Sequence, residues 1–237
     1  MRLHDFFETI GLSDYKASYN EILISALGGF LGVLAIFMIS QLLFDHEATV
    51  MIVPSMGASA VLLFAAPHAP FSQPWNVMAG HILSAAIGVA CWRWIPDLTV
   101  AASVGVGLAI GAMYFARCIH PPGGATALAA VIGSDQLHEL GFGYVFQPIL
   151  LNIAAILLIA ILFNGLFKWR RYPARLYFKT KSTSSEVDKY TPINHEDFVY
   201  ALSQIDTIVD VTEDDLLKIY QLATKRHQEV PQNTADA

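Results

Sequence analysis

Two histidines lie in predicted apolar segments that carry almost no charged side chains. His81 follows Gly80 in an apolar segment, and His120 begins the sequence His-Pro-Pro-Gly-Gly. An imidazole can donate to an anion, relay a proton or bond a backbone carbonyl, and inside a membrane such a costly group is a functional candidate. The alternative is that each histidine only satisfies a neighbouring backbone group. Metal binding is not indicated, because neither histidine stands at a recognised ligand spacing from Cys91 or Cys118.

Two seven-residue motifs resemble each other. Residues 54–60 read PSMGASA and residues 121–127 read PPGGATA, so that Ser59 aligns with Thr126. Each motif is followed, after a loop, by a Gln-Pro pair, at 73–74 and at 147–148. Because both similarities occur in the same order, we interpret the chain as two three-segment repeats. With six crossings, the repeats have the inverted topology that many transporters use around a midplane site.

The chemistry of the two motifs indicates helix starts within the membrane. Proline lacks an N–H and suits the first turn of a helix, and we expect a fresh helix from about Ala125. A helix that begins at membrane depth presents free N–H groups and a positive dipole end, which together can bind an anion. The hydroxyls of Ser55, Ser59 and Thr126 add donors. The alternative is a proline kink that binds nothing.

Two further polar residues flank these motifs. Arg117 can attract an anion, or it can anchor a helix end. Asn76, in the first turn of an apolar segment, can bond a neighbouring helix or a substrate. We find no paired carboxylates in the apolar region, no nucleophile elbow and no phosphate loop, so we expect neither an enzyme nor a cofactor. The predicted substrate site comprises Pro54, Ser55, Gly57, Ser59, Asn76, His81, Arg117, His120, Pro121, Pro122, Gly123, Gly124 and Thr126.

The distribution of charge predicts the elements that carry this site. The 237 residues are 54% hydrophobic and 14% charged, against about 25% charged in ordinary soluble domains. No Lys, Arg, Asp or Glu occurs from 48 to 92 or from 140 to 167. A lipid bilayer is therefore the expected partner, and nucleic acid is not. Apolar segments of spanning or near-spanning length cover 22–44, 48–66, 75–94, 98–116, 119–133 and 146–167.

The basic residues predict the orientation of these segments. Six lysines and arginines follow the last segment over 168–181, and two precede the first. Because basic residues favour the cytoplasmic side, both termini are expected in the cytoplasm, in a plasma membrane or a bacterial inner membrane. Segments 48–66 and 119–133 either cross fully or are re-entrant, and the charge pattern does not choose between these two topologies.

The chain divides into five parts by composition. We predict an interfacial lead-in (1–20), a transmembrane domain (21–170), a basic juxtamembrane linker (171–192), a small cytoplasmic helical hairpin (193–230) and a disordered tail (231–237). The run 168–181 is expected to face anionic lipid headgroups. The predicted fold is thus an all-α polytopic membrane bundle, with short or broken helices and a cytoplasmic hairpin.

The motifs resemble those of the HPP family of integral membrane proteins. The resemblance rests on residues 54–60, on the sequence Gln73 to Asn76, on Gly80-His81 and on residues 120–127, and it covers roughly 20–170. It implies four transmembrane helices and, from plastid and cyanobacterial members, nitrite transport. We therefore expect a transporter or channel for a small inorganic anion, in a homo-oligomer. The alternative is a membrane sensor or assembly protein that signals through its tail.

Overall fold

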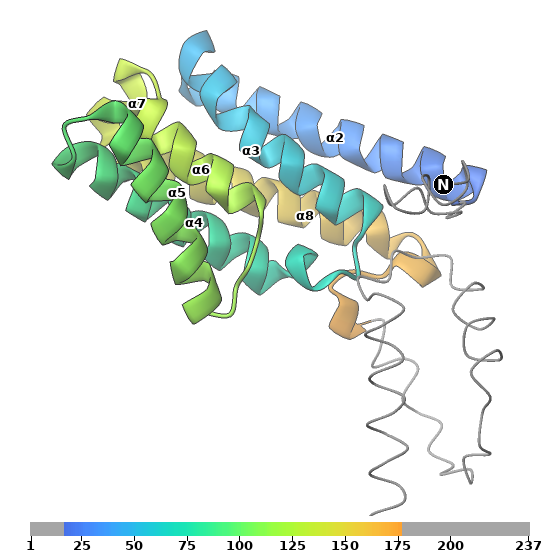
Figure 1. Ribbon diagram of the computed structural model, residues 1–237. Helices are drawn as coiled ribbons and strands as arrows, with labels where there is room; N and C mark the ends of the chain where they lie inside the picture. The colour runs from blue at the N-terminus through green and yellow to red at the C-terminus, as the bar shows by residue number, and fades with distance from the viewer. Residues whose placement is uncertain (1–16, 177–237) are drawn as a thin grey trace, which may run out of the picture. The chain divides into compact units, whose positions relative to one another are not determined.

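The described part of the protein is a bundle of helices. The computed structural model describes residues 17–176, and every regular element among them is helical, which confirms the all-α membrane class. Most of the predicted lead-in and of the linker at 171–192, together with the hairpin at 193–230 and the tail at 231–237, lie outside the described residues. The elements are α2 (Tyr19–Leu43), α3 (His46–Ala65), η1 (Pro70–Ser72), α4 (Pro74–Trp94), α5 (Leu98–Phe115), α6 (Pro122–Ile132), α7 (Asp135–Leu140), η2 (Val145–Leu150), α8 (Leu151–Gly165) and η3 (Lys168–Arg170) (Figure 1).

The helix starts follow from capping residues in the sequence. The side chain of Asp45 accepts the N–H of Ala48 at 2.8 Å, and Asp97 accepts the N–H of Val100 at 2.8 Å. α4 and α6 begin instead with proline in the first turn, where the missing N–H costs no hydrogen bond. Among the described residues, α2, α3, α4, α5 and the continuous η2–α8 helix are long and apolar enough to cross a membrane.

One end of the bundle collects both ends of the described chain. Glu21, near the start of α2, accepts hydrogen bonds from Trp169 and Arg170. The hydroxyl of Tyr172 donates to the carbonyl of Ser72 at 2.6 Å. The end of α5 lies here too, because the indole N–H of Trp75 donates to the carbonyl of Ala116 at 3.4 Å. We call this the basic end.

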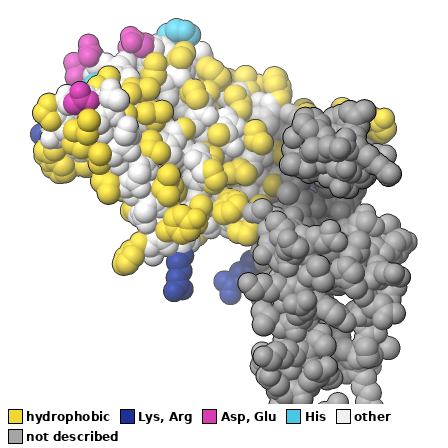
Figure 2. All heavy atoms as spheres, in the orientation of Figure 1, with side chains coloured by type: hydrophobic (Ala, Val, Ile, Leu, Met, Phe, Trp, Pro, Cys, Tyr) yellow, Lys and Arg dark blue, Asp and Glu magenta, His cyan; other side chains and the backbone are white. Residues whose placement is uncertain are grey.

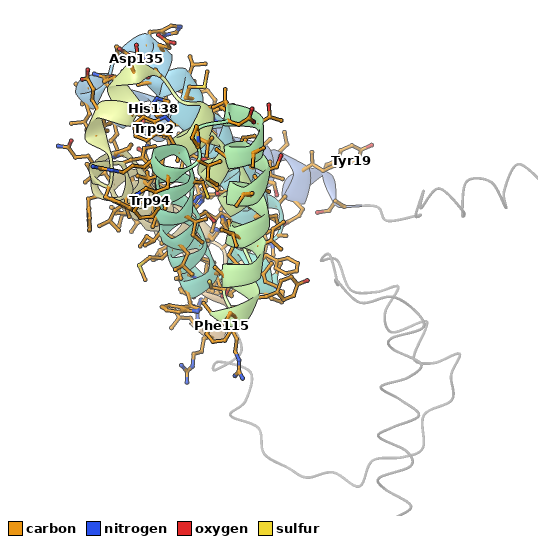
Figure 3. The ribbon with its side chains drawn as sticks, turned by 60° about the vertical axis from the view of Figure 1, so that its left-hand side comes forward. Tyr19, Trp92, Trp94, Phe115, Asp135 and His138 are labelled. Carbon is orange, nitrogen blue, oxygen red and sulfur yellow. The ribbon has the colours of Figure 1, made fainter. Side chains whose placement is uncertain are left out.

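The opposite end carries the acidic side chains. The N–H of Asp45, between α2 and α3, donates to the side chain of Gln136 in α7 at 3.1 Å. The ring of Trp92 near the end of α4 stacks on His138 of α7 at 4.1 Å between centroids. Figure 3 shows Trp92 and His138 together, far from Phe115 at the end of α5. We call this the acidic end, since Asp and Glu side chains gather there in Figure 2, whereas most visible Lys and Arg lie at the other end.

The two ends define how the chain traverses the bundle. α2, α3, α4 and α5 each run from one end to the other, and α8 returns to the basic end. α6 has 11 residues, or roughly 16 Å of helix, so it cannot span the bundle alone. Residues 116–121 and α6 together lead from the basic end to the acidic end. The short fifth segment is thus half loop and half helix, and the two three-segment repeats run in opposite directions.

The structure corrects two details of the repeat. α3 is one continuous helix through Pro54, so the predicted break at 54–57 is wrong. Pro54 is exposed on the surface of the bundle, and its missing N–H removes a single helical hydrogen bond. The second Gln-Pro pair also starts no helix, because Pro148 lies inside the π-helical turn η2, which continues into α8.

Glycines bring α4 and α6 into close contact. A Cβ at Gly88 would lie 2.4 Å from the carbonyl oxygen of Ala127, and one at Gly123 would lie 3.0 Å from the carbonyl oxygen of Gly80. A Cβ at Gly80 would in turn lie 2.7 Å from the Cβ of His120. Only glycine permits such approach of two backbones. This contact sets the position of α6, and of the loop before it, against α4.

Candidate functional site

Four polar side chains meet in the interior of the bundle. Ser59 comes from α3, His81 from α4, Thr126 from α6, and His120 from the loop that precedes α6. Each is fully buried, with none of its surface exposed. We call these four residues the polar cluster. The sequence predicted all four as site residues, and the structure brings them into direct contact.

The hydroxyl of Ser59 lies between the two imidazoles. Its Oγ is 2.8 Å from Nε2 of His81 and 2.9 Å from Nε2 of His120. The two Nε2 atoms are 3.2 Å apart, and the rings meet edge to face with centroids at 4.7 Å. A single hydroxyl thus contacts both histidines, although the two are 39 positions apart in the sequence.

The outer ring nitrogens are also bonded. Nδ1 of His81 lies 2.7 Å from Oγ1 of Thr126, and Nδ1 of His120 lies 2.8 Å from the carbonyl oxygen of Phe71 in η1. A carbonyl only accepts, so Nδ1 of His120 must carry a hydrogen. The cluster therefore reaches from α6 to η1 with every imidazole nitrogen paired.

The two hydroxyls of the polar cluster come from equivalent positions of the internal repeat. Ser59 and Thr126 occupy the same position of the two motifs, and each bonds a different nitrogen of His81. Motif and histidine come together because α3, α4 and α6 pack against one another near the glycine contacts described above. Two equivalent hydroxyls on antiparallel repeats therefore hold one imidazole from both sides.

The surroundings of the polar cluster are uncharged. Within residues 17–176 no carboxylate, lysine or arginine is hydrogen-bonded to either imidazole or to the two hydroxyls. Beyond Thr126, the hydroxyl of Tyr144 donates to the Thr126 carbonyl at 3.4 Å. Low polarity strengthens each hydrogen bond and also raises the cost of burying a charge. The cluster has no fixed charge of its own, so an anion or an excess proton would meet only hydrogen-bond donors and acceptors.

The ligand set does not match a metal centre. No group of three or more His, Cys, Asp or Glu side chains able to hold a metal occurs within residues 17–176. Two imidazole nitrogens and one hydroxyl fall short of the three or four His, Cys or carboxylate ligands that protein zinc sites use. Cys91 and Cys118 are both buried free thiols.

The remaining predicted site residues lie around the polar cluster rather than in it. The hydroxyl of Ser55 donates to its own helix at the carbonyl of Ile52, 3.0 Å away. The side-chain amide of Asn76 donates to the carbonyl of Ile119 at 3.0 Å and so fixes the loop that carries His120. Arg117 is exposed and adopts a left-handed backbone with φ of 53°.

The backbone N–H groups of the second motif are less available to a ligand than the sequence predicted. The N–H of Gly123 donates to the carbonyl of His120 at 2.8 Å, and that of Gly124 donates to Pro121 at 3.1 Å. Pro121 is exposed and Pro122 is the first residue of α6. A Cβ at Gly57 would meet nothing within 4 Å. The site is therefore built from side chains, not from two facing helix starts.

A second buried polar group lies at the basic end, and the sequence did not predict it. Arg170 is 1% exposed and pairs with Glu21. It also bonds Ser25 at 3.1 Å, Asn164 at 3.3 Å and the carbonyl of Phe64. Burial lowers the pKa of the Arg170 guanidinium, while the Glu21 carboxylate opposes that shift. The expectation that the whole run 168–181 faces lipid headgroups is wrong for Arg170. The sequence feature that could have indicated this ion pair is Glu21, an acidic residue at the start of the apolar segment 22–44.

Comparison with known proteins agrees with the transmembrane architecture. The profile described as "HPP, transmembrane region" matches residues 14–173. Two transmembrane proteins of Dictyostelium discoideum are similar to the chain, at 38% identity over 165 residues and 39% over 152 residues. These matches cover 68% and 62% of this chain, which spans about half, 53%, of each relative's length. No solved structure matches the chain significantly.

Proposed function

The chain belongs to the HPP transmembrane family, and we propose that it is a transporter or channel for a small inorganic anion of the nitrite class, with the polar cluster as its substrate site. The family resemblance supports the class of substrate, and the inverted three-segment repeats support transport. Many transporters place their site where such repeats meet, often at a discontinuous helix. Here that helix is α6, and it contributes Thr126 to the cluster.

The observation that carries the proposal is a fully buried polar cluster between membrane-spanning helices. Polar side chains inside a bilayer are costly and mark substrate pathways or proton relays. A small anion that leaves water needs hydrogen-bond donors in place of its hydration shell. The hydroxyls of Ser59 and Thr126 and an N–H group of His81 are such donors, whereas the Nδ1–H group of His120 donates to the Phe71 carbonyl. An anion entering the cluster would exchange their mutual hydrogen bonds for bonds to itself.

We also propose that the basic end faces the cytoplasm. Arg117, Lys168, Arg170 and Arg171 lie there, whereas the acidic end carries Arg93 as its one basic residue among those described. The positive-inside rule then places the described start and end of the chain on the cytoplasmic side. A carried anion would cross between this side and the acidic end.

The test is anion uptake into proteoliposomes that contain the full chain. Uptake of nitrite, nitrate, formate and chloride is compared with that of protein-free vesicles, because the acids of nitrite and formate cross lipid unaided. We expect uptake of at least one anion, with nitrite favoured. The absence of uptake for all four, in protein shown by circular dichroism and gel filtration to be folded, would contradict the proposal.

A further inference from the structure

We infer that the polar cluster is a proton relay, in which one excess proton passes between His81 and His120 through the hydroxyl of Ser59. The inference deepens the proposed function and rests on it for its physiological role, since the proton would accompany the carried anion. Its structural basis is the set of hydrogen bonds from Thr126 through His81 and Ser59 to His120, which can be satisfied in two opposite directions. The bond from His120 to the Phe71 carbonyl keeps one direction.

In the neutral cluster the hydrogen bond from His120 to Phe71 determines the direction of all the others. Nδ1–H of His120 donates to the Phe71 carbonyl, so Nε2 of His120 must accept. The Ser59 hydroxyl donates to that nitrogen and accepts from Nε2–H of His81. Nδ1 of His81 then accepts from the hydroxyl of Thr126. Each hydroxyl also has its own helix carbonyl as a longer alternative, Ser55 at 3.1 Å from Ser59 and Pro122 at 3.4 Å from Thr126.

One added proton leaves the same contacts satisfied. When Nδ1 of His81 is protonated, it donates to Oγ1 of Thr126, whose hydroxyl turns to the carbonyl of Pro122. His81 is then an imidazolium that donates at both nitrogens, and its Nε2–H still points at Ser59. No donor faces a donor, because the Pro122 carbonyl receives the hydrogen that the imidazole no longer accepts.

The relay step moves this charge without any further reactant. The N–H bond at Nε2 of His81 breaks as its proton forms a new O–H bond on Ser59. The former O–H bond of Ser59 breaks as its proton forms an N–H bond on Nε2 of His120. His120 becomes the imidazolium and His81 becomes neutral, with its hydrogen on Nδ1. The bonds of 2.8 and 2.9 Å through Ser59 are shorter than the direct 3.2 Å path between the two Nε2 atoms.

The surroundings limit the cluster to one excess proton. Within residues 17–176, the titratable side chains hydrogen-bonded in or next to the cluster are the two histidines and Tyr144, which lies beyond Thr126. No acidic side chain within residues 17–176 is bonded to either imidazole to balance a second charge. Two cations at 3.2 Å in a buried site would repel strongly. A hydronium ion or the acid of the carried anion supplies the proton at Nδ1 of His81. Water accepts a proton from Nδ1 of His120 when the hydrogen bond to the Phe71 carbonyl opens, which leaves the hydrogen of His120 on Nε2. Both rings must then exchange tautomers before a second proton can pass in the same direction.

The first experiment observes the hydrogens directly. The full chain, labelled with ¹⁵N-histidine, is studied in lipid bilayers by solid-state NMR, with signals assigned through His81→Gln and His120→Gln. At neutral pH we expect the Nε2–H tautomer for His81 and the Nδ1–H tautomer for His120. On acidification one charge should be shared by the pair. An Nε2–H tautomer at His120, or full protonation of both rings together, would overturn the relay.

If a histidine variant fails to fold, Ser59→Thr identifies the two rings of the cluster, because it keeps the hydroxyl and shifts both pairs of ring signals. Thr126→Ser then distinguishes His81, the one imidazole of the pair that Thr126 contacts. The same spectrum of the Ser103→Ala protein is the control, since Ser103 is exposed on α5 and bonds only its own helix. Signals of both histidines that move with Ser103→Ala and not with Ser59→Thr would also count against the relay.

The second experiment measures proton movement with anion uptake. Vesicles enclose a pH-sensitive dye, and the anion with the highest uptake is added outside. We expect acidification beyond that of protein-free vesicles, a loss of roughly tenfold in Ser59→Ala, recovery in Ser59→Thr and no change in Ser103→Ala. Anion uptake without proton movement would overturn the relay and leave the proposed function standing. No uptake of any anion would overturn the proposed function, while the tautomers would still decide the relay.

Discussion

At the scale of single residues, the interior polar groups work as paired donors and acceptors. His81 is held by Ser59 and Thr126, one at each ring nitrogen. Buried polar groups are tolerated when all partners are present and are costly when one is missing. The sequence indicated which residues belong to the site, because polar types stood out in an apolar context. It could not indicate that Phe71 contributes a carbonyl, because every residue has one.

Thr126→Val tests the cost of an unpaired imidazole nitrogen. Valine keeps the shape of threonine but offers Nδ1 of His81 no partner, so we expect a loss of about 1–3 kcal/mol in the free energy of unfolding. Thermal or denaturant unfolding in detergent measures it. Ser103→Ala, at an exposed position, should change stability by less than about 0.5 kcal/mol. Equal stability of the two variants would contradict the described contact.

Arg170→Met tests the buried pair at the basic end. Removing the guanidinium leaves Glu21, Asn164 and the Phe64 carbonyl without their shared donor, which should cost about 3–5 kcal/mol. Lys168→Met is the matched control, because Lys168 is exposed in the same turn. Unfolding midpoints of the two proteins are compared in the same detergent. A similar midpoint for both would show that the pair contributes little.

At the scale of elements, the position of the site is set by close packing of helices and not by the periodicity of apolar residues. The apolar segments and their approximate ends followed from charge and from proline and glycine, and five of the six are long helices or nearly so. The break expected at Pro54 did not occur, because α3 continues through this exposed proline at the loss of one backbone hydrogen bond. The sequence predicted no helix between the segments 119–133 and 146–167, where α7 lies, because only Leu137 and Leu140 of its six residues are apolar.

Gly88→Ala tests the contact between α4 and α6. Its added methyl would meet the Ala127 carbonyl oxygen at 2.4 Å, so the two helices must separate, which should cost about 1–3 kcal/mol. Gly107→Ala is the control on α5, where a Cβ has no neighbour within 4 Å, and it should stabilise the helix by about 0.5–1 kcal/mol. Unfolding measurements that rank the two variants the other way would contradict the packing.

At the scale of the whole molecule, the even number of traverses follows from contacts between distant segments. The bonds between Glu21 and Arg170 place the start and end of the described chain on one side. The charge pattern alone left a re-entrant fifth segment open, because either topology put one arginine on the unfavoured side. The structure resolves this with a half-loop, half-helix passage, which hydropathy cannot distinguish from a short span.

Site-directed labelling tests the number of traverses. Glu139→Cys at the acidic end and Lys168→Cys at the basic end are exposed positions, whereas the native Cys91 and Cys118 are buried. In intact cells a membrane-impermeant thiol reagent should label the first variant and not the second, and opened cells should show both. The unsubstituted protein gives the background. Labelling of both variants from the same side would contradict six traverses.

Anion uptake by Ser59→Ala beside Ser103→Ala tests most directly whether the polar cluster is the transport site. Both changes remove one hydroxyl from a helix, but only Ser59 joins His81 and His120. We predict that Ser103→Ala matches the unaltered protein, while Ser59→Ala loses roughly tenfold in initial uptake, equivalent to about 1.4 kcal/mol, with the fold retained. Equal uptake by the two variants would contradict the central claim.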